Sequence, residues 1–137
     1  MPFQAIIFDC DGVLINSPYI EALTFHDTLN EDGIPFSMED YEALIFGRTT
    51  AEQGAQIAKL YEQSFQIPMP EKYWQDLKGR AKHIILEQAT LMPNVLETLK
   101  RIKLPMAVAS NSEQQELEDK LHRYGLHDCF APNYFSA

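Results

Sequence analysis

Residues 4–17, QAIIFDCDGVLINS, decide the fold that this sequence predicts. Residues 5–8 form a continuous apolar, β-favouring run, which is typical of a strand buried on both faces of a parallel sheet. The run ends abruptly at Asp9, and Asp11 follows two residues later. Because α/β sheets place their chemistry at the carboxyl ends of their strands, both carboxylates are candidate site residues.

Two carboxylates this close repel each other by about 3 kcal/mol, for a separation of about 5 Å and an effective dielectric constant of about 20. A bound cation removes this cost, and Mg²⁺ prefers hard oxygen ligands, so Asp9 and Asp11 predict a magnesium site. There are two simpler interpretations. Asp-x-Asp-Gly is common in turns. It also opens calcium-binding loops, but apolar Val13, Leu14 and Ile15 follow where such a loop needs further acids.

The composition excludes several classes of partner. The 137 residues, 45% of them hydrophobic, are enough for a real core. A net charge of −9 argues against nucleic-acid and anionic-membrane partners. We find no charged leader followed by an apolar segment and no apolar run long enough to span a bilayer. Cys10, expected to be a buried thiol, and Cys129 form no disulfide framework or metal spacing, so a cytoplasmic location is the simplest.

The segment after the first strand is helical throughout. Ser17 followed by Pro18 predicts a helix N-terminus, Ser37 another, and Thr49 with Glu52 forms a capping box for a third helix. The expected helices cover residues 17–33, 37–47, 49–67 and 70–89. Since no strand pattern occurs in this segment, it predicts an inserted α-helical domain.

Helices and strands alternate in the remainder. We expect a short helix at residues 95–103, a strand at 106–110, a helix opened by a capping box of Ser112 with Gln115, and a short strand near Tyr134. This order predicts an α/β fold. Its Rossmann-like parallel sheet core would be incomplete, with about three strands. The core would comprise residues 1–16 and 88–137, and the helical cap residues 17–87.

Two segments carry a family resemblance. FDCDGVLINS, residues 8–17, resembles the first motif of the haloacid dehalogenase superfamily, Asp-x-Asp-Gly-(Thr/Val)-Leu-x-x-Ser. MAVASNS, residues 106–112, resembles the second motif, in which a serine ends a strand. The pair, with helical sequence between, is far more specific than either motif alone. The helical insertion is similar to the small cap of the β-phosphoglucomutase-like branch.

The resemblance implies a role for each motif residue. Asp9 would attack phosphorus and form an aspartyl-phosphate, which water then hydrolyses. Asp11 would protonate the leaving oxygen and later activate water, and dehalogenases proper lack an acid at this position. Mg²⁺ would take one Asp9 oxygen and the backbone carbonyl of Asp11. Ser110 and the N–H of Asn111 would bind the phosphate. Without the resemblance, residues 110–112 would be interpreted as an ordinary helix cap. Ser112 is expected to cap the following helix under both interpretations.

The cap and two departures from the family pattern bear on the substrate. Arg48, in a turn between two predicted helices, would bind a phosphate or carboxylate, or is a solvated surface arginine. Asn16 replaces an aspartate common in the family, but it can still cap. Glu21 stands where the family's mutases usually carry a histidine, which favours a phosphatase. The histidines have no acid or cysteine arranged as ligand partners and receive no role: His26, His83, His122 and His127.

The family's third and fourth motifs, a lysine and paired acids, are not found after Ser110. Lys120 lies inside a predicted helix and is interpreted as a surface charge, with Glu113, Glu116, Glu118 and Asp119 on the same helix. We therefore expect the chain to be part of a longer phosphatase, weak or inactive alone. The first strand would then expose a bare apolar edge.

Taken together, the sequence predicts a Mg²⁺-dependent phosphatase that acts on a small phosphorylated metabolite, with a sugar phosphate as the first candidate. Two alternatives stay open at this point. One is a non-catalytic remnant that acts by association, as a homodimer that covers the open sheet edge. The other is a phosphosugar mutase.

Overall fold

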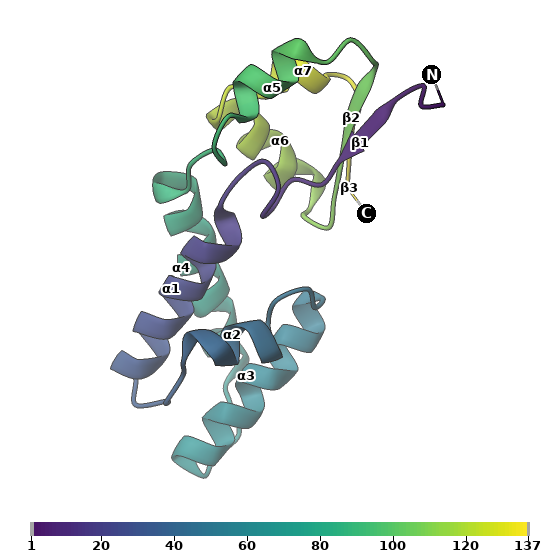
Figure 1. The fold of residues 1–137 in the computed structure, drawn as a ribbon. Coiled ribbons are helices and arrows are strands. Elements are labelled where there is room, and N and C mark those ends of the chain that lie inside the picture. The colour runs from purple at the N-terminus through teal and green to yellow at the C-terminus, as the bar shows by residue number, and fades with distance from the viewer. Residues whose placement is uncertain (1, 137) are drawn as a thin grey trace. The chain divides into compact units, whose positions relative to one another are not determined.

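The computed structural model describes residues 2–136. Three strands and seven helices lie within this range (Figure 1). The chain divides into two compact units: one contains the chain up to Ser17 and again from Ala89 onward, and the other is Pro18–Gln88. The first unit holds all three strands and the second is helical.

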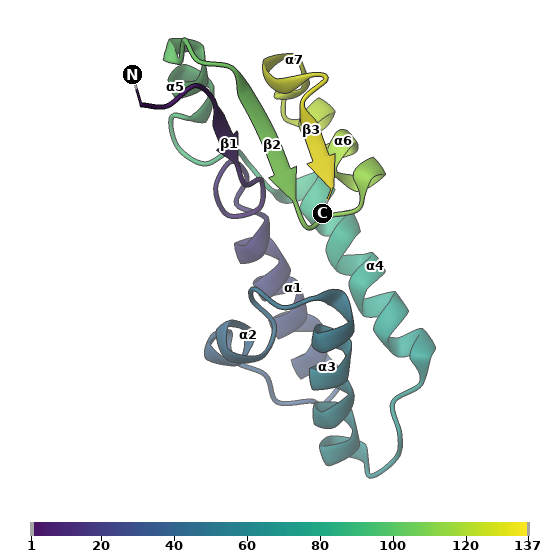
Figure 2. The same ribbon diagram turned by 90° about the vertical axis from the view of Figure 1, so that its right-hand side faces the viewer.

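The mixed unit is built on a parallel sheet with the strand order β1–β2–β3. The strands are β1 (Ile6–Phe8), β2 (Met106–Ser110) and β3 (Tyr134–Ser136), and they lie side by side in Figure 2. The accompanying helices are α5 (Val95–Arg101), α6 (Gln114–Arg123) and α7 (His127–Phe130). The predicted α/β class and three-stranded parallel sheet are therefore confirmed.

Helices α6 and α7 cover one face of this sheet. Val108 in the central strand is fully buried. The Phe8 and Phe130 rings meet edge to face, with their centroids 5.9 Å apart. Leu117 and Leu121, one helical turn apart on α6, are also fully buried. This spacing gives α6 one apolar stripe, as a helix packed on a sheet requires.

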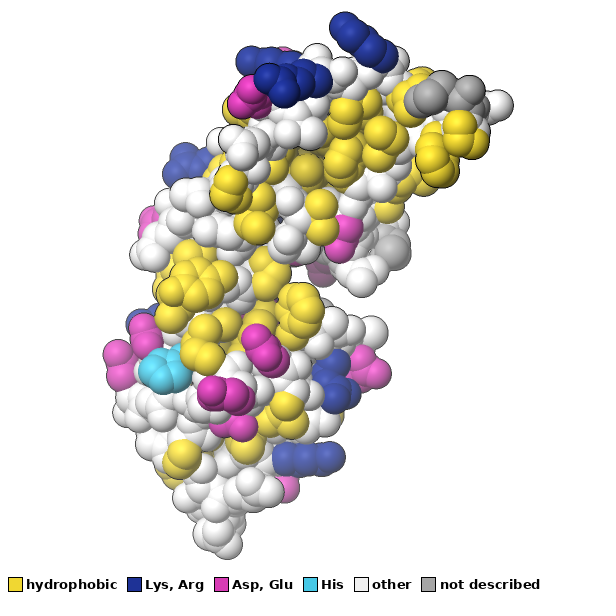
Figure 3. Space-filling model, in the orientation of Figure 1, with side chains coloured by type: hydrophobic (Ala, Val, Ile, Leu, Met, Phe, Trp, Pro, Cys, Tyr) yellow, Lys and Arg dark blue, Asp and Glu magenta, His cyan; other side chains and the backbone are white. Residues whose placement is uncertain are grey.

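The opposite face of the sheet is open. Successive side chains of a strand point to opposite faces, so Ile7 and Phe135 lie away from Val108. Ile7 is 71% exposed and Phe135 is 55% exposed. Figure 3 shows hydrophobic side chains gathered over the strands. The prediction of a first strand buried on both faces is therefore wrong, because within residues 2–136 β1 pairs only with β2 and its Ile7 face is uncovered. The expected bare edge is present.

The helical unit contains α1 (Ser17–Glu31), α2 (Met38–Leu44), α3 (Thr50–Phe65) and α4 (Glu71–Gln88), and no strand falls in this range, as predicted. Its core is centred on Phe25, which packs edge to face against Phe36, Tyr41 and Trp74. The predicted capping box of α3 is confirmed: Thr49 N–H donates to Glu52 (2.8 Å), and Glu52 N–H donates to the Thr49 hydroxyl (3.3 Å). Among residues 2–136, none of the helices is long and apolar enough to cross a bilayer.

Candidate active site

Parallel pairing of β1 and β2 brings two polar segments together at the carboxyl-terminal end of the sheet. Asp9 and Asp11 follow β1, and Ser110 ends the neighbouring strand β2. The Ser112 hydroxyl donates to Asp11 Oδ2 at 3.0 Å, although the two residues are 101 positions apart. The two motif segments identified in the sequence therefore meet in space.

A tight loop after β1 fixes the two carboxylates. The Cys10 carbonyl accepts hydrogen bonds from the N–H groups of Val13, Leu14 and Ile15, at 3.3, 2.9 and 3.2 Å. Gly12 has a φ of 81°, a left-handed conformation that favours glycine. Cys10 is fully buried, as expected, and burial together with nearby charges, chiefly Asp11, raises the pKa of its thiol to about 12. This thiol therefore stays protonated at neutral pH.

The Asp11 carboxylate accepts from three side chains. Its Oδ1 accepts from the Ser17 hydroxyl and from the Lys120 ammonium (3.0 Å), and its Oδ2 accepts from Ser112. Burial alone would raise the pKa of Asp11. The Lys120 charge and the hydrogen bonds from Ser17, Lys120 and Ser112 outweigh burial and lower this pKa below its ordinary value. Asp11 is therefore an ionised, well-held carboxylate at neutral pH.

Lys120 is the residue that the sequence analysis placed wrongly. Far from being a surface charge, it is only 3% exposed. Its Nζ lies 3.0 Å from Asp11, 3.3 Å from Glu116 and 3.2 Å from the Ser112 hydroxyl. Burial lowers the pKa of Lys120, but the two carboxylates raise it above its ordinary value. The helical spacing could have indicated this burial. Lys120 lies three residues after the buried Leu117, so it falls on the same apolar stripe of α6.

Two predicted caps are replaced by contacts with Asp11. The N-cap of α6 is Glu113, with no side-chain capping bond, so the predicted Ser112 capping box is wrong. The Ser112 hydroxyl bonds Asp11 instead, and so does the Ser17 hydroxyl at the start of α1.

The remaining motif residues surround this contact. Asp9 is exposed, and its Oδ1 accepts from the Cys10 N–H at 2.8 Å. Ser110 is buried, and its hydroxyl accepts from the Ser112 N–H at 3.1 Å, whereas Asn111 is exposed. Asp9 is thus open to solvent, while the Ser110 hydroxyl is held within its own loop.

The oxygens near the end of β1 are of the kind that a magnesium ion prefers. The Asp11 carboxylate accepts from Ser17 and Lys120 at Oδ1 and from Ser112 at Oδ2, so most of its acceptor positions are already used. The exposed Asp9 carboxylate and the Asp11 main-chain carbonyl are both hard oxygen donors. Both donor types are ones that Mg²⁺ prefers in proteins.

The other residues singled out in the sequence have local partners. Exposed Arg48, in the helical unit, donates from Nη2 to the Ala43 carbonyl at 3.1 Å. Glu21 accepts from the Tyr41 hydroxyl at 3.1 Å and lies 3.4 Å from Lys78 Nζ. Asn16, which directly precedes α1, accepts at its Oδ1 from the Thr90 N–H at 2.7 Å.

The histidines do have acidic partners, which corrects the sequence analysis. His83 Nε2 lies 3.1 Å from Glu87, and His122 Nε2 lies 4.0 Å from Glu118. His127 stacks on His122 with a ring-centroid distance of 3.8 Å. Both acid pairs have an i, i+4 spacing that is visible in the sequence.

Comparison with known proteins gives the same fold. Residues 6–136 match the family model of haloacid dehalogenase-like hydrolases. A haloacid dehalogenase-like protein of unknown function from Agrobacterium tumefaciens is 30% identical, with a TM-score of 0.81 over 98% of this chain and 59% of that one. A HAD family hydrolase from Deinococcus radiodurans, with bound phosphate and sodium, is 25% identical, with a TM-score of 0.77 over 98% of this chain and 58% of that one.

A third solved structure, a predicted phosphoglycolate phosphatase from Haemophilus somnus, shares the fold at 24% identity, with a TM-score of 0.77 over 99% of this chain and 63% of that one. This chain therefore spans about three-fifths of the length of these solved structures. The family match covers nearly all of the sequence printed here. The chain belongs to the haloacid dehalogenase-like hydrolase family.

Proposed function

We propose that the protein is a phosphatase that hydrolyses a small phosphorylated metabolite through an aspartyl-phosphate intermediate. The observation that carries the proposal is the 3.0 Å hydrogen bond from Ser112 to Asp11, which joins the ends of β1 and β2 beside an exposed Asp9. Carboxylates and hydroxyls at neighbouring strand ends are the groups that phosphoryl transfer needs. A sugar phosphate is the first candidate substrate.

Asp9 is the proposed nucleophile. Its carboxylate is exposed and can approach phosphorus in line with the leaving oxygen, forming a new O–P bond as the ester bond breaks. The Ser110 hydroxyl and the Asn111 N–H would hold the phosphate oxygens. Bound Mg²⁺, held by Asp9 and the Asp11 carbonyl, would supply positive charge that offsets the repulsion between the carboxylate and the phosphate dianion.

Asp11 is the proposed acid for the leaving oxygen and base for the hydrolytic water. With its pKa lowered by Lys120 and by its hydroxyl donors, it is rarely protonated at neutral pH. Its acid role therefore requires that it separates from Lys120 and takes up a proton when substrate binds. Lys120 thus acts through Asp11, as a positioning residue.

We further propose that the helical unit serves as the cap, with Arg48 as its contact to a substrate phosphate or carboxylate. A mutase is less well supported, because Glu21 is engaged by Tyr41 and Lys78 within the helical core. Association is a second candidate role. The exposed Ile7 on β1, a strand that pairs only with β2 within residues 2–136, favours a homodimer formed through the free edge of β1.

The phosphatase proposal is tested with the full-length gene product as the parent, because this chain spans about three-fifths of the length of the related solved structures; the assay is hydrolysis of 4-nitrophenyl phosphate with Mg²⁺. We expect Asp9→Asn to lower turnover by more than about a thousandfold and chelation of Mg²⁺ to abolish it. Asp76→Asn, which changes an exposed aspartate in α4, is the matched control and should leave the rate unchanged. Equal rates for the parent and Asp9→Asn would rule the mechanism out.

A second measurement does not depend on turnover. Trifluoroberyllate mimics a phosphoryl group attached to an aspartate, so the parent with Mg²⁺ should give a bound ¹⁹F NMR signal. Asp9→Asn should give none, and Asp76→Asn should give the parent signal. A bound signal that persists in Asp9→Asn would contradict the assignment of the nucleophile.

A further inference from the structure

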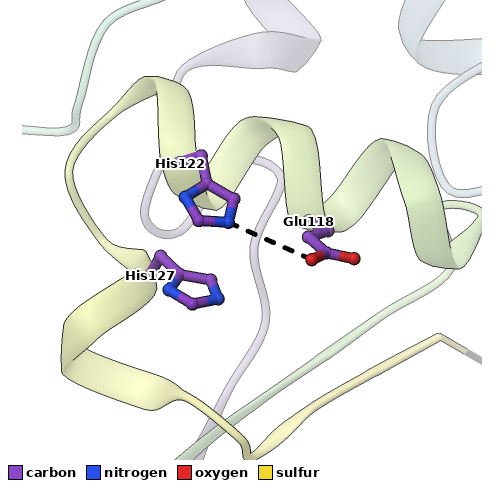
Figure 4. Close-up of side chains that lie close together, drawn as sticks. All are labelled: Glu118, His122 and His127. Atoms are coloured by element: carbon purple, nitrogen blue, oxygen red, sulfur yellow. Dashed lines mark ion pairs between the residues drawn. The ribbon is translucent and has the colours of Figure 1, made fainter.

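Three potential metal ligands meet at the side of α6, away from the Asp9 loop in the sequence. Glu118 and His122 are one turn apart on α6, and His127 is the first residue of α7. One ligand atom from each residue lies within 4.8 Å of the other two. Figure 4 shows that both imidazole rings present a nitrogen toward the side where Glu118 lies.

The turn between the helices creates this grouping. Gly125 has a φ of 72°, which lets the chain reverse after α6. His127 therefore returns beside His122, and the two rings stack with an interplanar angle of 16°. Glu118 completes the group, with its Oε1 4.0 Å from His122 Nε2.

The separations are close to those of a metal site. Zinc–nitrogen bonds of about 2.0–2.1 Å in a tetrahedral site place ligand atoms about 3.3 Å apart. The three ligand atoms lie within 4.8 Å of one another, but the two rings stack at an interplanar angle of 16°, so the rings would have to rotate out of the stack to direct one nitrogen each at the same ion. The side chain of His122 is 58% exposed, so an ion can enter from solvent and keep a water molecule as its fourth ligand.

Two further groups lie next to the ligands. Asp128 Oδ1 lies 3.5 Å from His127 Nδ1, in an ion pair whose carboxylate is fully exposed. The Tyr134 ring lies beside His127, with a centroid distance of 5.5 Å.

We propose that Glu118, His122 and His127 form a binding site for a zinc ion. Two imidazoles and one carboxylate suit Zn²⁺, whereas Mg²⁺ prefers oxygen ligands alone. The site is separate from the residues proposed for phosphoryl transfer, and it does not depend on that function. Its three protein ligands and one solvent position are typical of zinc that is accessible to small molecules.

The test is isothermal titration calorimetry, in which Zn²⁺ is titrated into the purified chain in the presence of excess Mg²⁺. We expect one equivalent to bind, and His122→Ala, His127→Ala and Glu118→Gln each to weaken binding about tenfold or more. His83→Ala is the matched control, because His83 forms a similar i, i+4 pair with Glu87 at 3.1 Å. It should bind like the parent. Far-ultraviolet circular dichroism checks that every variant is folded.

Two further measurements separate this site from the other possible ligands. Bound Co²⁺ should give visible bands of a nitrogen–oxygen site and no thiolate charge-transfer band, and Cys129→Ser should leave the spectrum unchanged. Asp9→Asn should bind Zn²⁺ like the parent, which makes the result independent of the phosphatase proposal. The proposal would be overturned if the parent failed to bind Zn²⁺, if His122→Ala and His127→Ala bound Zn²⁺ as tightly as the parent, or if the Co²⁺ spectrum showed a thiolate band.

Discussion

Lys120 places a positive charge inside the candidate active site, with Asp11 and Glu116 3.0 and 3.3 Å from its ammonium group. The lysine is almost completely buried, and the Asp11 side chain is 31% exposed. A buried charge is costly unless it is paired, so each partner depends on the other. The pair therefore contributes to the fold and also sets the protonation of Asp11.

Lys120→Met should lower the free energy of unfolding by about 3 kcal/mol, because it leaves Asp11 ionised without its counter-charge. The double variant Lys120→Met with Asp11→Asn should recover a large part of this loss, since the Asp11 charge is then removed together with the Lys120 charge. Urea unfolding followed by circular dichroism measures both. Lys100→Met, which changes an exposed lysine in α5, should stay within about 0.5 kcal/mol of the parent. A similar loss in Lys100→Met would contradict the assignment.

The same pair predicts how stability depends on pH. The folded-state pKa of Asp11 lies below its ordinary value of 3.8, so its contribution is present above that value and is lost as pH falls through the folded pKa. The pKa of Lys120 lies above its ordinary value of 10.5, so its contribution is present below 10.5 and is lost as pH rises through the folded pKa. The pair should thus contribute most at neutral pH.

Without added metal, the parent should lose more free energy of unfolding between neutral pH and about pH 3 than the double variant Lys120→Met with Asp11→Asn. The difference isolates the Asp11 titration, because the other carboxylates are common to both proteins. Urea unfolding at the two pH values gives the result. Equal losses would show that Lys120 does not lower the pKa of Asp11.

At the scale of elements, the sequence predicted what depends on local contacts. The strand at Met106–Ser110 and the capping box of α3 were found because apolar runs and i, i+3 caps involve neighbours in the chain. The Ser112 cap was wrong because α6 begins one residue later, with Glu113 as its N-cap, and the hydrogen bond that Ser112 donates to Asp11, 101 positions away, cannot be predicted from neighbouring residues. The helical pattern that contains Lys120 was identified, but its buried side depends on packing against the sheet.

The capping box of α3 gives a prediction for a single element. Thr49→Ala removes the hydroxyl that accepts from the Glu52 N–H, so it should destabilise the protein by about 1 kcal/mol. Thr50→Ala, which changes the exposed first residue of α3, should have an effect within about 0.5 kcal/mol. Thermal unfolding of both variants measures the difference. Equal stability of the two would mean that the cap contributes nothing.

At the scale of the whole molecule, the sheet has a covered face and an open one. The buried Val108 lies on the face packed by α6 and α7, while Ile7 and Phe135 are exposed on the other. The strand β1 also has an unpaired edge within residues 2–136. An exposed apolar edge strand favours pairing with a second copy, which a net charge of −9 opposes.

This balance predicts a salt-dependent association. In sedimentation velocity over a concentration series, the parent should form dimers more readily as salt rises, because screening reduces the repulsion between two acidic chains. Ile7→Lys should keep the protein monomeric, because it puts a charge on the open face at the sheet edge. Ile67→Lys is the matched control: Ile67 is 54% exposed but lies in the helical unit, so this variant should associate like the parent. A monomeric parent at every salt concentration, or equal association of Ile7→Lys and Ile67→Lys, would show that this edge is not where two copies meet.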